Sequence, residues 1–284
     1  MIYVYLVAAA AALPLLDNFI NVFHRQNSWW QVPLIFIGIF LGLIILHLCV
    51  LAVSIALVDL KGPSERCSGY YRALIGATLP MLFKLARVHI HTTGAEKVPP
   101  HGSFLLVCNH THDIDPAVII NELPKARLGF IAKKEIYTDM RFIAKAMHKL
   151  HCLPIDRENN RNAVETIVNA IKLIKSDTVS VGVFPEGYTS LDGRLHEFRN
   201  GVFKIAVKAQ CPVTVCTLVG VRAAVKRLFL HRTDIYFDIV ETILPEDIAG
   251  MSTAEIGERV HRDMERSLAN RNAEVQEPKK GKSL

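Results

Sequence analysis

One uncharged segment near the amino terminus restricts the folds open to this chain more than any other feature. From Val32 to Val58 there is no Asp, Glu, Lys or Arg, and only His47 and Ser54 interrupt an otherwise apolar or glycine-containing run. As a helix this run is roughly 40 Å long, enough to cross the ~30 Å hydrocarbon core of a bilayer with some tilt. The sequence therefore predicts a transmembrane helix.

A second apolar run, Ile2–Leu16, is shorter and contains Pro14. It is compatible with a second span. A cleaved signal peptide fits less well, because no basic segment precedes the run. We therefore interpret residues 1–60 as a membrane anchor with one or two transmembrane helices.

The charges are distributed unevenly about this anchor. Residues 1–60 carry a net charge of −1, so the remainder carries +7 against +6 for the whole chain. Such a basic domain suits anionic lipid headgroups or phosphorylated substrates. Nucleic acid is not an expected partner, because no base-stacking or groove-reading motif is present. The cations that follow the apolar run are Lys61, Arg66, Arg72, Lys84 and Arg87. By the positive-inside rule they predict an integral membrane protein whose catalytic domain lies on the cytoplasmic face.

The segment 61–93 mixes apolar and basic residues, most clearly between Tyr70 and Val88. It is predicted to form an interfacial helix lying on the bilayer, although a helix packed against a protein core would have the same pattern.

After Gly94, short continuous apolar runs alternate with helical patterns. The runs read as buried strands, and the pattern in 162–175 has the period of an amphipathic helix. Near the end, Ser252 and Glu255 form a capping box before another helix. The predicted strands are 104–108, 128–132, 179–184 and 213–219. This alternation predicts an α/β fold over 94–271, with a mostly parallel central sheet flanked by helices. Residues 272–284 are predicted to be a disordered basic tail.

A histidine and an aspartate follow the first of these strands. His110 stands at the strand end, and Asp115 stands five residues later where a helix begins. Asp115 can face His110 across the loop, fix the imidazole tautomer, and leave the second ring nitrogen free to accept a proton from a hydroxyl. Asp115 followed by Pro116 is also typical of a helix N-cap, and one side chain can serve both purposes.

A metal site is the other interpretation of this cluster, since His112 and Asp113 lie between the two residues. The pattern of dinuclear metallohydrolases is incomplete here, because Ile114 occupies the position of a required aspartate. We therefore favour the general base and expect no metal.

Four sequence blocks resemble, in order, the signatures of the glycerolipid acyltransferase family, over roughly 94–219. The first is Asn109-His110 with Asp115, and the second runs from Lys133-Lys134-Glu135 to Pro154-Ile155-Asp156-Arg157. The third is Phe184-Pro185-Glu186-Gly187-Tyr188-Thr189-Ser190, and the fourth is Cys211-Pro212-Val213-Thr214-Val215. The resemblance implies His110 and Asp115 as catalytic residues. It implies that Lys133, Arg157, Glu186, Gly187 and Arg199 bind substrate.

Two departures from the family pattern stand out. His151 occupies a position where the family often has glycine. In the third block, Tyr188 and Thr189 replace a usual threonine and arginine, which removes one expected phosphate-binding cation. Arg194, Arg199 and Lys204 are the residues that could compensate.

The resemblance implies transfer of a fatty acyl group from a thioester to the free hydroxyl of a lysophospholipid, with lysophosphatidic acid as the default acceptor. The thioester is acyl-CoA or acyl carrier protein, and no other cofactor is expected. Two alternatives stay open at this point. One is a metal-dependent phosphoesterase, and the other is a non-catalytic lipid-binding relative.

Overall fold

The central element of the fold is a seven-stranded sheet. The computed structural model describes residues 2–20, 30–66, 68–227 and 231–276. The sheet has the order β1-β7-β6-β2-β5-β3-β4, and every neighbouring pair is parallel except β6 and β7. The strands are β1 Val88–Thr93, β2 Leu105–Cys108, β3 Leu128–Lys133, β4 Leu153–Ile155, β5 Ser180–Val183, β6 Val213–Val219 and β7 Thr233–Ile243. The predicted α/β class with a mostly parallel sheet is confirmed.

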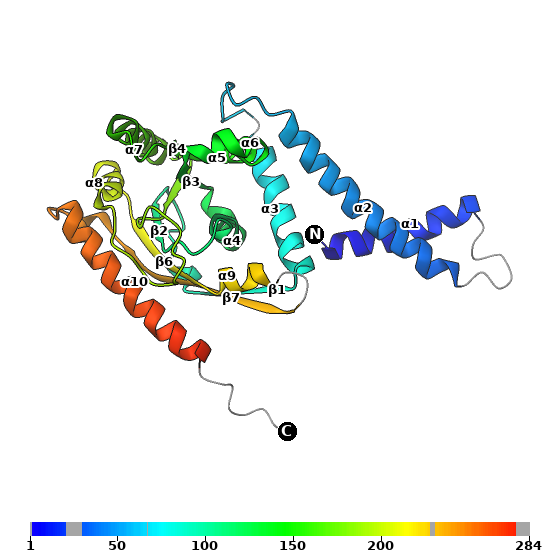
Figure 1. Ribbon diagram of the computed structural model, residues 1–284. Helices are drawn as coiled ribbons and strands as arrows, with labels where there is room; N and C mark the ends of the chain where they lie inside the picture. Colours follow the sequence, from blue (N-terminus) through cyan, green and yellow to red (C-terminus); the bar gives the residue numbers. More distant parts are fainter. Residues whose placement is uncertain (1, 21–29, 67, 228–230, 277–284) are drawn as a thin grey trace.

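Helices cover both faces of the sheet (Figure 1). One face packs against α3 (Ser68–Leu85), α4 (Asp115–Glu122) and α9 (Val221–Lys226). The other packs against α7 (Asn160–Lys175), α8 (Lys204–Ala209) and α10 (Thr253–Gln276). Two further helices, α5 (Lys134–Asp139) and α6 (Arg141–Lys149), follow β3. Short 3-10 turns occupy Ala95–Lys97, Pro124–Ala126, Asn200–Phe203 and Pro245–Ile248.

This two-sided cover explains the continuous apolar strands. In β2, Leu105 and Val107 belong to the core beneath α7, α8 and α10, whereas Leu106 and Cys108 belong to the core beneath α3 and α4. All four side chains are fully buried. A strand that is buried on both faces needs apolar residues at every position, because successive side chains point to opposite sides.

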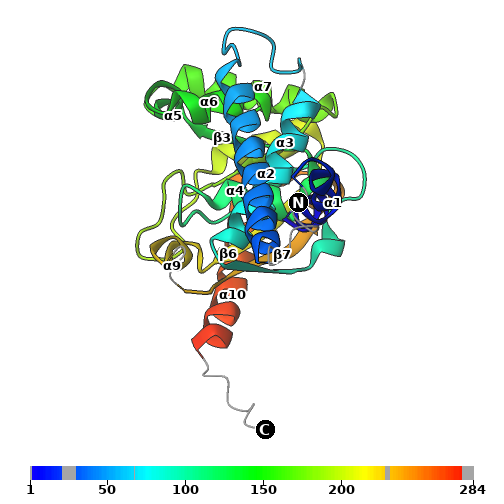
Figure 2. The same ribbon diagram turned by 90° about the vertical axis from the view of Figure 1, so that its right-hand side faces the viewer.

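Two apolar helices precede the domain, α1 (Ile2–Ile20) and α2 (Gln31–Ala56). They pack against each other and project from the domain (Figures 1 and 2). Among the described residues, α2 is the helix that is long and apolar enough to cross a membrane. The apolar part of α1 is shorter, although the helix continues through Pro14.

Helix α3 joins these two helices to the domain. Its Thr78 accepts or donates a hydrogen bond with His47 of α2 at 2.8 Å. From the same helix, Arg72 donates to the carbonyl oxygens of Leu128 and Leu150, at the ends of β3 and α6. Tyr70, Leu82 and Leu85 nevertheless remain exposed. The packed-helix interpretation of this segment is therefore correct, and contact of its exposed side with a bilayer stays a prediction.

Two predicted boundaries need correction. Residues 88–93, which the sequence assigned to the segment before the domain, form β1 and pair with β7. Residues 272–276, predicted to be disordered, continue α10 to Gln276, while 277–284 lie outside the described residues. The capping box before α10 is present, since Ser252 and Glu255 each accept a backbone N–H from the other.

The backbone at His151 has the conformation that suits the glycine often found at this position in the family, and nothing in the structure explains the histidine. His151 has φ = +61°, in the left-handed region where glycine is favoured. Its side chain is buried, and neither ring nitrogen has a hydrogen-bond partner within the described ranges. Burial, with the Arg72 charge adding to it, lowers the pKa of this imidazole. The ring is therefore held neutral, at some cost in stability.

We expect His151→Gly to be more stable than His151→Ala by about 1 kcal/mol, because only glycine relieves the left-handed backbone strain. In the wild type, the unfolded histidine gains a proton as pH falls through about 6.5, whereas the folded one, with its lowered pKa, gains it only at lower pH, so stability is lost between the two. Neither variant should show this loss. Thermal unfolding in detergent from pH 7.5 to 5.5 checks both statements, and His151→Ala matching His151→Gly would contradict the first.

Candidate active site

The predicted catalytic pair lies where two central strands end. His110 follows β2 and Asp115 opens α4. Strands β2 and β5 are neighbours and parallel. The loop after β2 and the loop after β5 therefore leave the sheet at the same edge, where ligands bind in open α/β folds.

The two side chains meet as the spacing predicted. His110 Nδ1 lies 2.9 Å from Asp115 Oδ2. The Asp115 carboxylate is fully buried, and the same oxygen accepts the backbone N–H groups of Thr111 at 2.6 Å and His112 at 2.9 Å. These donors stabilise the charged carboxylate, which in turn places the imidazole proton on Nδ1. His110 Nε2 is then left with a lone pair for an incoming hydroxyl.

Asp115 does not cap its own helix. The N–H groups that it binds precede α4, and Pro116 follows it in the first turn. The N-cap interpretation is therefore wrong, although Pro116 does occupy the helix start as predicted.

Glu186 fixes the backbone of the catalytic histidine. Its Oε1 accepts the N–H of His110 at 2.9 Å and its Oε2 accepts the N–H of His196 at 3.1 Å. The side chain is almost fully buried, which raises the pKa of the carboxyl, and the two N–H donors oppose that rise. Because both oxygens are used within the chain, we assign Glu186 a positioning role. The substrate contact implied by the family resemblance stays a prediction.

Three residues outside the predicted set complete this arrangement. Phe184 stacks on the His110 ring with centroids 4.2 Å apart, and Ser190 donates its N–H to the His110 carbonyl at 2.7 Å. The Asn109 amide exchanges two hydrogen bonds with the Leu218 backbone, which ties the ends of β2 and β6 together. All three residues lie in the recognised blocks. The sequence therefore showed that they belong to the matching segments, but not which contacts they make.

Two arginine side chains, Arg157 and Arg199, have no carboxylate partner among the residues that the structure describes, and Arg199 lies beside Gly187. Arg157 is half-buried, and the pKa of its guanidinium is lowered first by burial and then by the charge of Arg199. Within the described ranges, neither arginine forms an ion pair or a side-chain hydrogen bond. Asp156, the preceding residue in the sequence, binds Lys134 at 2.6 Å. Two adjacent unpaired guanidinium groups are suited to an anion such as a phosphate.

The remaining predicted residues lie at the edges of this pair. Lys133 is exposed, and its Nζ lies 3.8 Å from Glu135 Oε2. The charge of Glu135 also raises the pKa of Arg157, against the larger lowering by burial and by Arg199. Of the three possible compensating cations, Arg199 is the one whose guanidinium packs against the Gly187 backbone. The Tyr188 side chain is half-exposed and contacts the His196 ring. Nothing in the structure explains why Tyr188 and Thr189 replace the usual pair.

Gly187 has φ = +78°, and a Cβ atom there would lie 2.8 Å from Arg199 Nε. We expect Gly187→Ala to displace the Arg199 side chain and to cost about 1–2 kcal/mol of backbone strain. The affinity for an anionic acceptor should fall, whereas Gly193→Ala, at φ = +74° with open space around it, should strain the backbone alone. Equal acceptor KM values for these two variants would contradict the assignment of Gly187 to the anion site.

The described ranges contain no group of three or more His, Cys, Asp or Glu side chains placed to hold a metal ion. His112 Nδ1 accepts the N–H of Ile114 at 3.3 Å instead. That part of the chain therefore contains no assembled set of metal ligands of the kind that a metal-dependent phosphoesterase requires.

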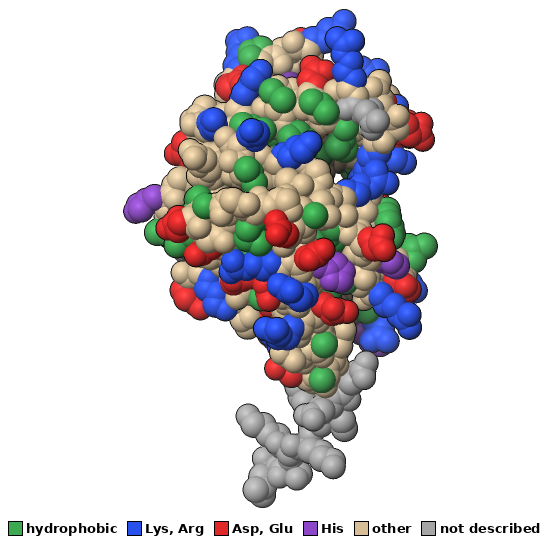
Figure 3. All heavy atoms as spheres, turned by 90° about the vertical axis from the view of Figure 1, so that its left-hand side faces the viewer, with side chains coloured by type: hydrophobic (Ala, Val, Ile, Leu, Met, Phe, Trp, Pro, Cys, Tyr) green, Lys and Arg blue, Asp and Glu red, His purple; other side chains and the backbone are tan. Residues whose placement is uncertain are grey.

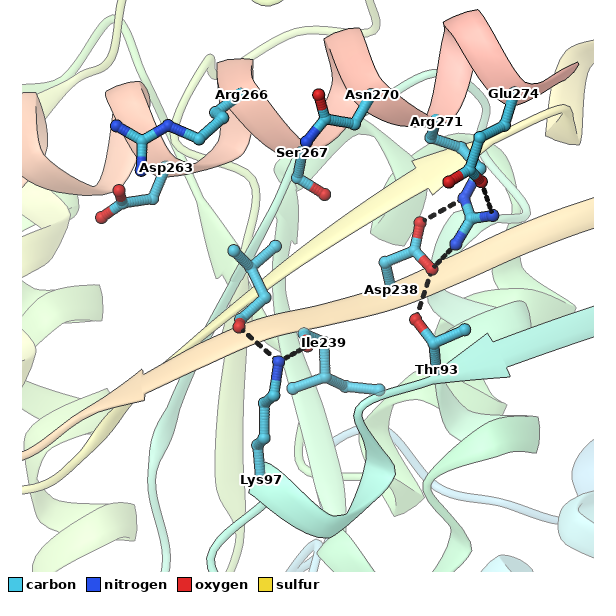
Figure 4. Close-up of a pocket in the computed structure, with 11 residues that line it drawn as sticks. Thr93, Lys97, Asp238, Ile239, Asp263, Arg266, Ser267, Asn270, Arg271 and Glu274 are labelled. Carbon is cyan, nitrogen blue, oxygen red and sulfur yellow. Dashed lines mark hydrogen bonds and ion pairs between the residues drawn. The ribbon is translucent and has the colours of Figure 1, made fainter.

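A cavity of about 290 Å³ lies elsewhere, between β7 and α10 (Figure 4). Its charged lining is largely paired, since Arg271 binds Asp238 at 2.6 Å and Thr93 donates to the same carboxylate. None of the predicted site residues lines it. We interpret it as the packing boundary of α10.

Comparison with known proteins gives matches centred on this site. Residues 89–219 match the family model described as acyltransferase. The chain is 30% identical over 149 residues to a probable 1-acyl-sn-glycerol-3-phosphate acyltransferase of Mycoplasma pneumoniae, covering 49% of this chain and 55% of the relative. It is 27% identical over 159 residues to a protein of that name from Limnanthes alba, covering 56% of this chain and 54% of the relative. These alignments thus span about half the length of the curated relatives.

The fold also matches a solved structure. The crystal structure of the 1-acyl-sn-glycerophosphate acyltransferase PlsC from Thermotoga maritima aligns with a TM-score of 0.62 at 20% identity, over 96% of this chain and 98% of that one. The likeness includes the N-terminal helices and supports the same fold.

Proposed function

We propose, because residues 89–219 match the acyltransferase family model, that this chain transfers a fatty acyl group from a thioester to the free hydroxyl of lysophosphatidic acid. The product would be phosphatidic acid, an intermediate of phospholipid synthesis. The observation that carries the proposal is the His110–Asp115 pair at the carboxyl end of β2, with His110 Nε2 free to act as a general base.

Acyl transfer requires a group that accepts the proton of the lysolipid hydroxyl and contacts that keep this hydroxyl in position for attack. His110 Nε2 removes the proton of the lysolipid hydroxyl as its oxygen attacks the thioester carbonyl carbon. The tetrahedral intermediate then expels the thiolate, which takes up a proton, and the ester bond remains on the glycerol. Asp115 stabilises the imidazolium that forms in between. A base held in this way contributes roughly 10²- to 10⁴-fold to the rate. The donor would be acyl-CoA or acyl carrier protein.

Arg157 and Arg199 support lysophosphatidic acid as the acceptor. A phosphate monoester offers several anionic oxygens, and two adjacent guanidinium groups can bind them with charge-assisted hydrogen bonds. Such a contact would hold the glycerol hydroxyl in register with His110, and this positioning is itself a large part of catalysis.

The anchor suits a membrane-dissolved acceptor. Helix α2 would hold the domain at the bilayer surface, where a lysolipid arrives by lateral diffusion and the thioester arrives from water. The cations that follow α2 support the cytoplasmic side as the location of the domain. Whether α1 also spans the bilayer belongs to the same proposal.

The test is thiol release together with mass detection of the lipid product, using purified chain, lysophosphatidic acid and long-chain acyl-CoA in the presence of EDTA. Phosphatidic acid formation would support the proposal, and its insensitivity to EDTA would oppose a metal-dependent reaction. A folded protein that yields no product with acyl-CoA, acyl carrier protein donors or other lysolipids would contradict it in favour of a lipid-binding relative.

A further inference from the structure

A group of exposed apolar side chains lies at the end of α2 where the chain enters the domain. Leu57, directly after α2, is 78% exposed, and Phe142 at the start of α6 is 49% exposed. Met140 and Ile143 beside Phe142 are exposed as well. We name these four residues the α6 corner. Isolated exposed apolar residues need no explanation, but a cluster of large ones marks a contact surface.

The α6 corner is fixed relative to the anchor. Lys145 of α6 donates to the carbonyl of Ala56, the last residue of α2. His148 contacts the Gly62 carbonyl at 2.9 Å, and Lys149, although buried, donates to the carbonyls of Pro63 and Arg66. Helix α6 is thus joined by hydrogen bonds to the end of α2 and to the segment that follows it, and Figure 2 shows α6 beside that end of α2.

The position of Phe142 follows from helix geometry. Residues three apart lie on one side of a helix, so Phe142 shares its side of α6 with Lys145, which reaches the end of α2. A membrane-spanning helix ends near the headgroups, and any residue held beside that end lies at the same depth. The face over α7, α8 and α10 instead carries interspersed charges of both signs (Figure 3).

We propose that the α6 corner inserts into the interfacial layer of the bilayer that α2 enters, with Phe142 as its deepest side chain, so that the domain docks on the membrane at a second point beside its anchor. An apolar helical face of this kind lies about 5–10 Å into the boundary between headgroups and acyl chains. The inference rests on α2 as the anchor and does not depend on acyl transfer.

Charge attraction is not what holds this contact. The exposed cations at the corner are Lys61, Arg66 and Arg141, and the exposed carboxylates are Asp59, Glu65 and Asp139. Lys145, on the same side of α6 as Phe142, adds one positive charge, but its ammonium group is bound to the Ala56 carbonyl. Because the fully exposed charges balance, insertion of the apolar side chains must supply most of the binding. The contact should therefore persist in phosphatidylcholine bilayers and at high salt.

The experiment places a single tryptophan in the full chain after Trp29 and Trp30, the two native ones, are replaced by Phe. The protein is reconstituted in phosphatidylcholine bilayers that contain nitroxide-labelled lipid. Phe142→Trp and Ile143→Trp test the corner. Leu41→Trp, exposed within α2, is the positive control, and Val207→Trp, exposed on α8 away from the anchor, is the negative control.

We expect a nitroxide near the headgroups to quench the emission of Phe142→Trp and Ile143→Trp. A deep nitroxide should quench Leu41→Trp. Neither nitroxide should quench Val207→Trp. Emission at positions 142 and 143 that is as unquenched as at 207 would overturn the proposal. A blue-shifted but unquenched tryptophan at 142 would overturn it in favour of a contact with a second copy. An unquenched Leu41→Trp would remove the anchor on which it rests.

Discussion

Replacement of His110 by alanine is expected to lower the rate of acyl transfer by roughly 10²- to 10⁴-fold, because the variant lacks the group that accepts the hydroxyl proton. The effect should fall on kcat, since the arginine pair that would bind the acceptor is unchanged. The His110 ring stacks on Phe184 at the surface end of the core, so its loss should reduce thermal stability only modestly. Steady-state thiol release, with circular dichroism to verify folding, measures both.

His112→Ala is the matched control, since His112 lies two residues away and, among the described residues, its ring forms a hydrogen bond with the Ile114 N–H alone. It should retain most of the activity. If His112→Ala and His110→Ala lose activity equally while both remain folded, the base would not be His110 alone, and the metal interpretation of the cluster would regain support.

Replacement of Arg157 by alanine should raise the KM for lysophosphatidic acid by roughly 10- to 150-fold, which corresponds to the ~1.5–3 kcal/mol typical of a hydrogen bond to a charged group. The half-buried position of Arg157 strengthens its contact with an anion, because solvent screens it less than an exposed cation. Initial-rate kinetics against acceptor concentration provide the measurement.

Arg161→Ala is the control for charge alone, because Arg161 is exposed on α7 four residues further on. Its effect on KM should stay within about twofold, as for surface charges in general. A monoacylglycerol acceptor offers a second check, since it has the hydroxyl but no phosphate. If Arg157→Ala impairs transfer to this acceptor as much as to lysophosphatidic acid, Arg157 does not bind the phosphate.

The parts of the fold that could be predicted are those with a continuous apolar pattern. Strands β2, β5 and β6 are buried on both faces, and β3 is buried over its first three residues, so all four were visible as apolar runs. Strand β7 was missed because polar residues such as Asp234, Asp238 and Glu241 interrupt it. It pairs with β1, whose sequence Val-His-Ile-His-Thr-Thr alternates in the same way. Strand β4 has three residues, too few for any periodicity.

The candidate site likewise contains contacts that could be predicted from the sequence and contacts that could not. The His110–Asp115 contact could be predicted because five residues of chain confine the two side chains to one loop. The partnership of Glu186 with the His110 backbone could not, because it joins residues 76 apart in sequence and depends on β2 and β5 being neighbours in the sheet. That Arg157 has no side-chain partner in the described part of the chain was equally hidden, since Asp156 and Glu158 flank it in the sequence and only the fold directs Asp156 toward Lys134.

The backbone hydrogen bonds of His110 affect how the acceptor preference of this fold can be altered by mutation. The histidine backbone is bound on both sides by the loop after β5, through Glu186 at its N–H and Ser190 at its carbonyl. That same loop carries Gly187 and the neighbouring Arg199. One loop therefore carries both the residues proposed to bind the acceptor and the residues that position His110. A variant library over 186–190 aimed at a new headgroup should lose speed along with its old preference, and recovering the speed will require changes near residue 110.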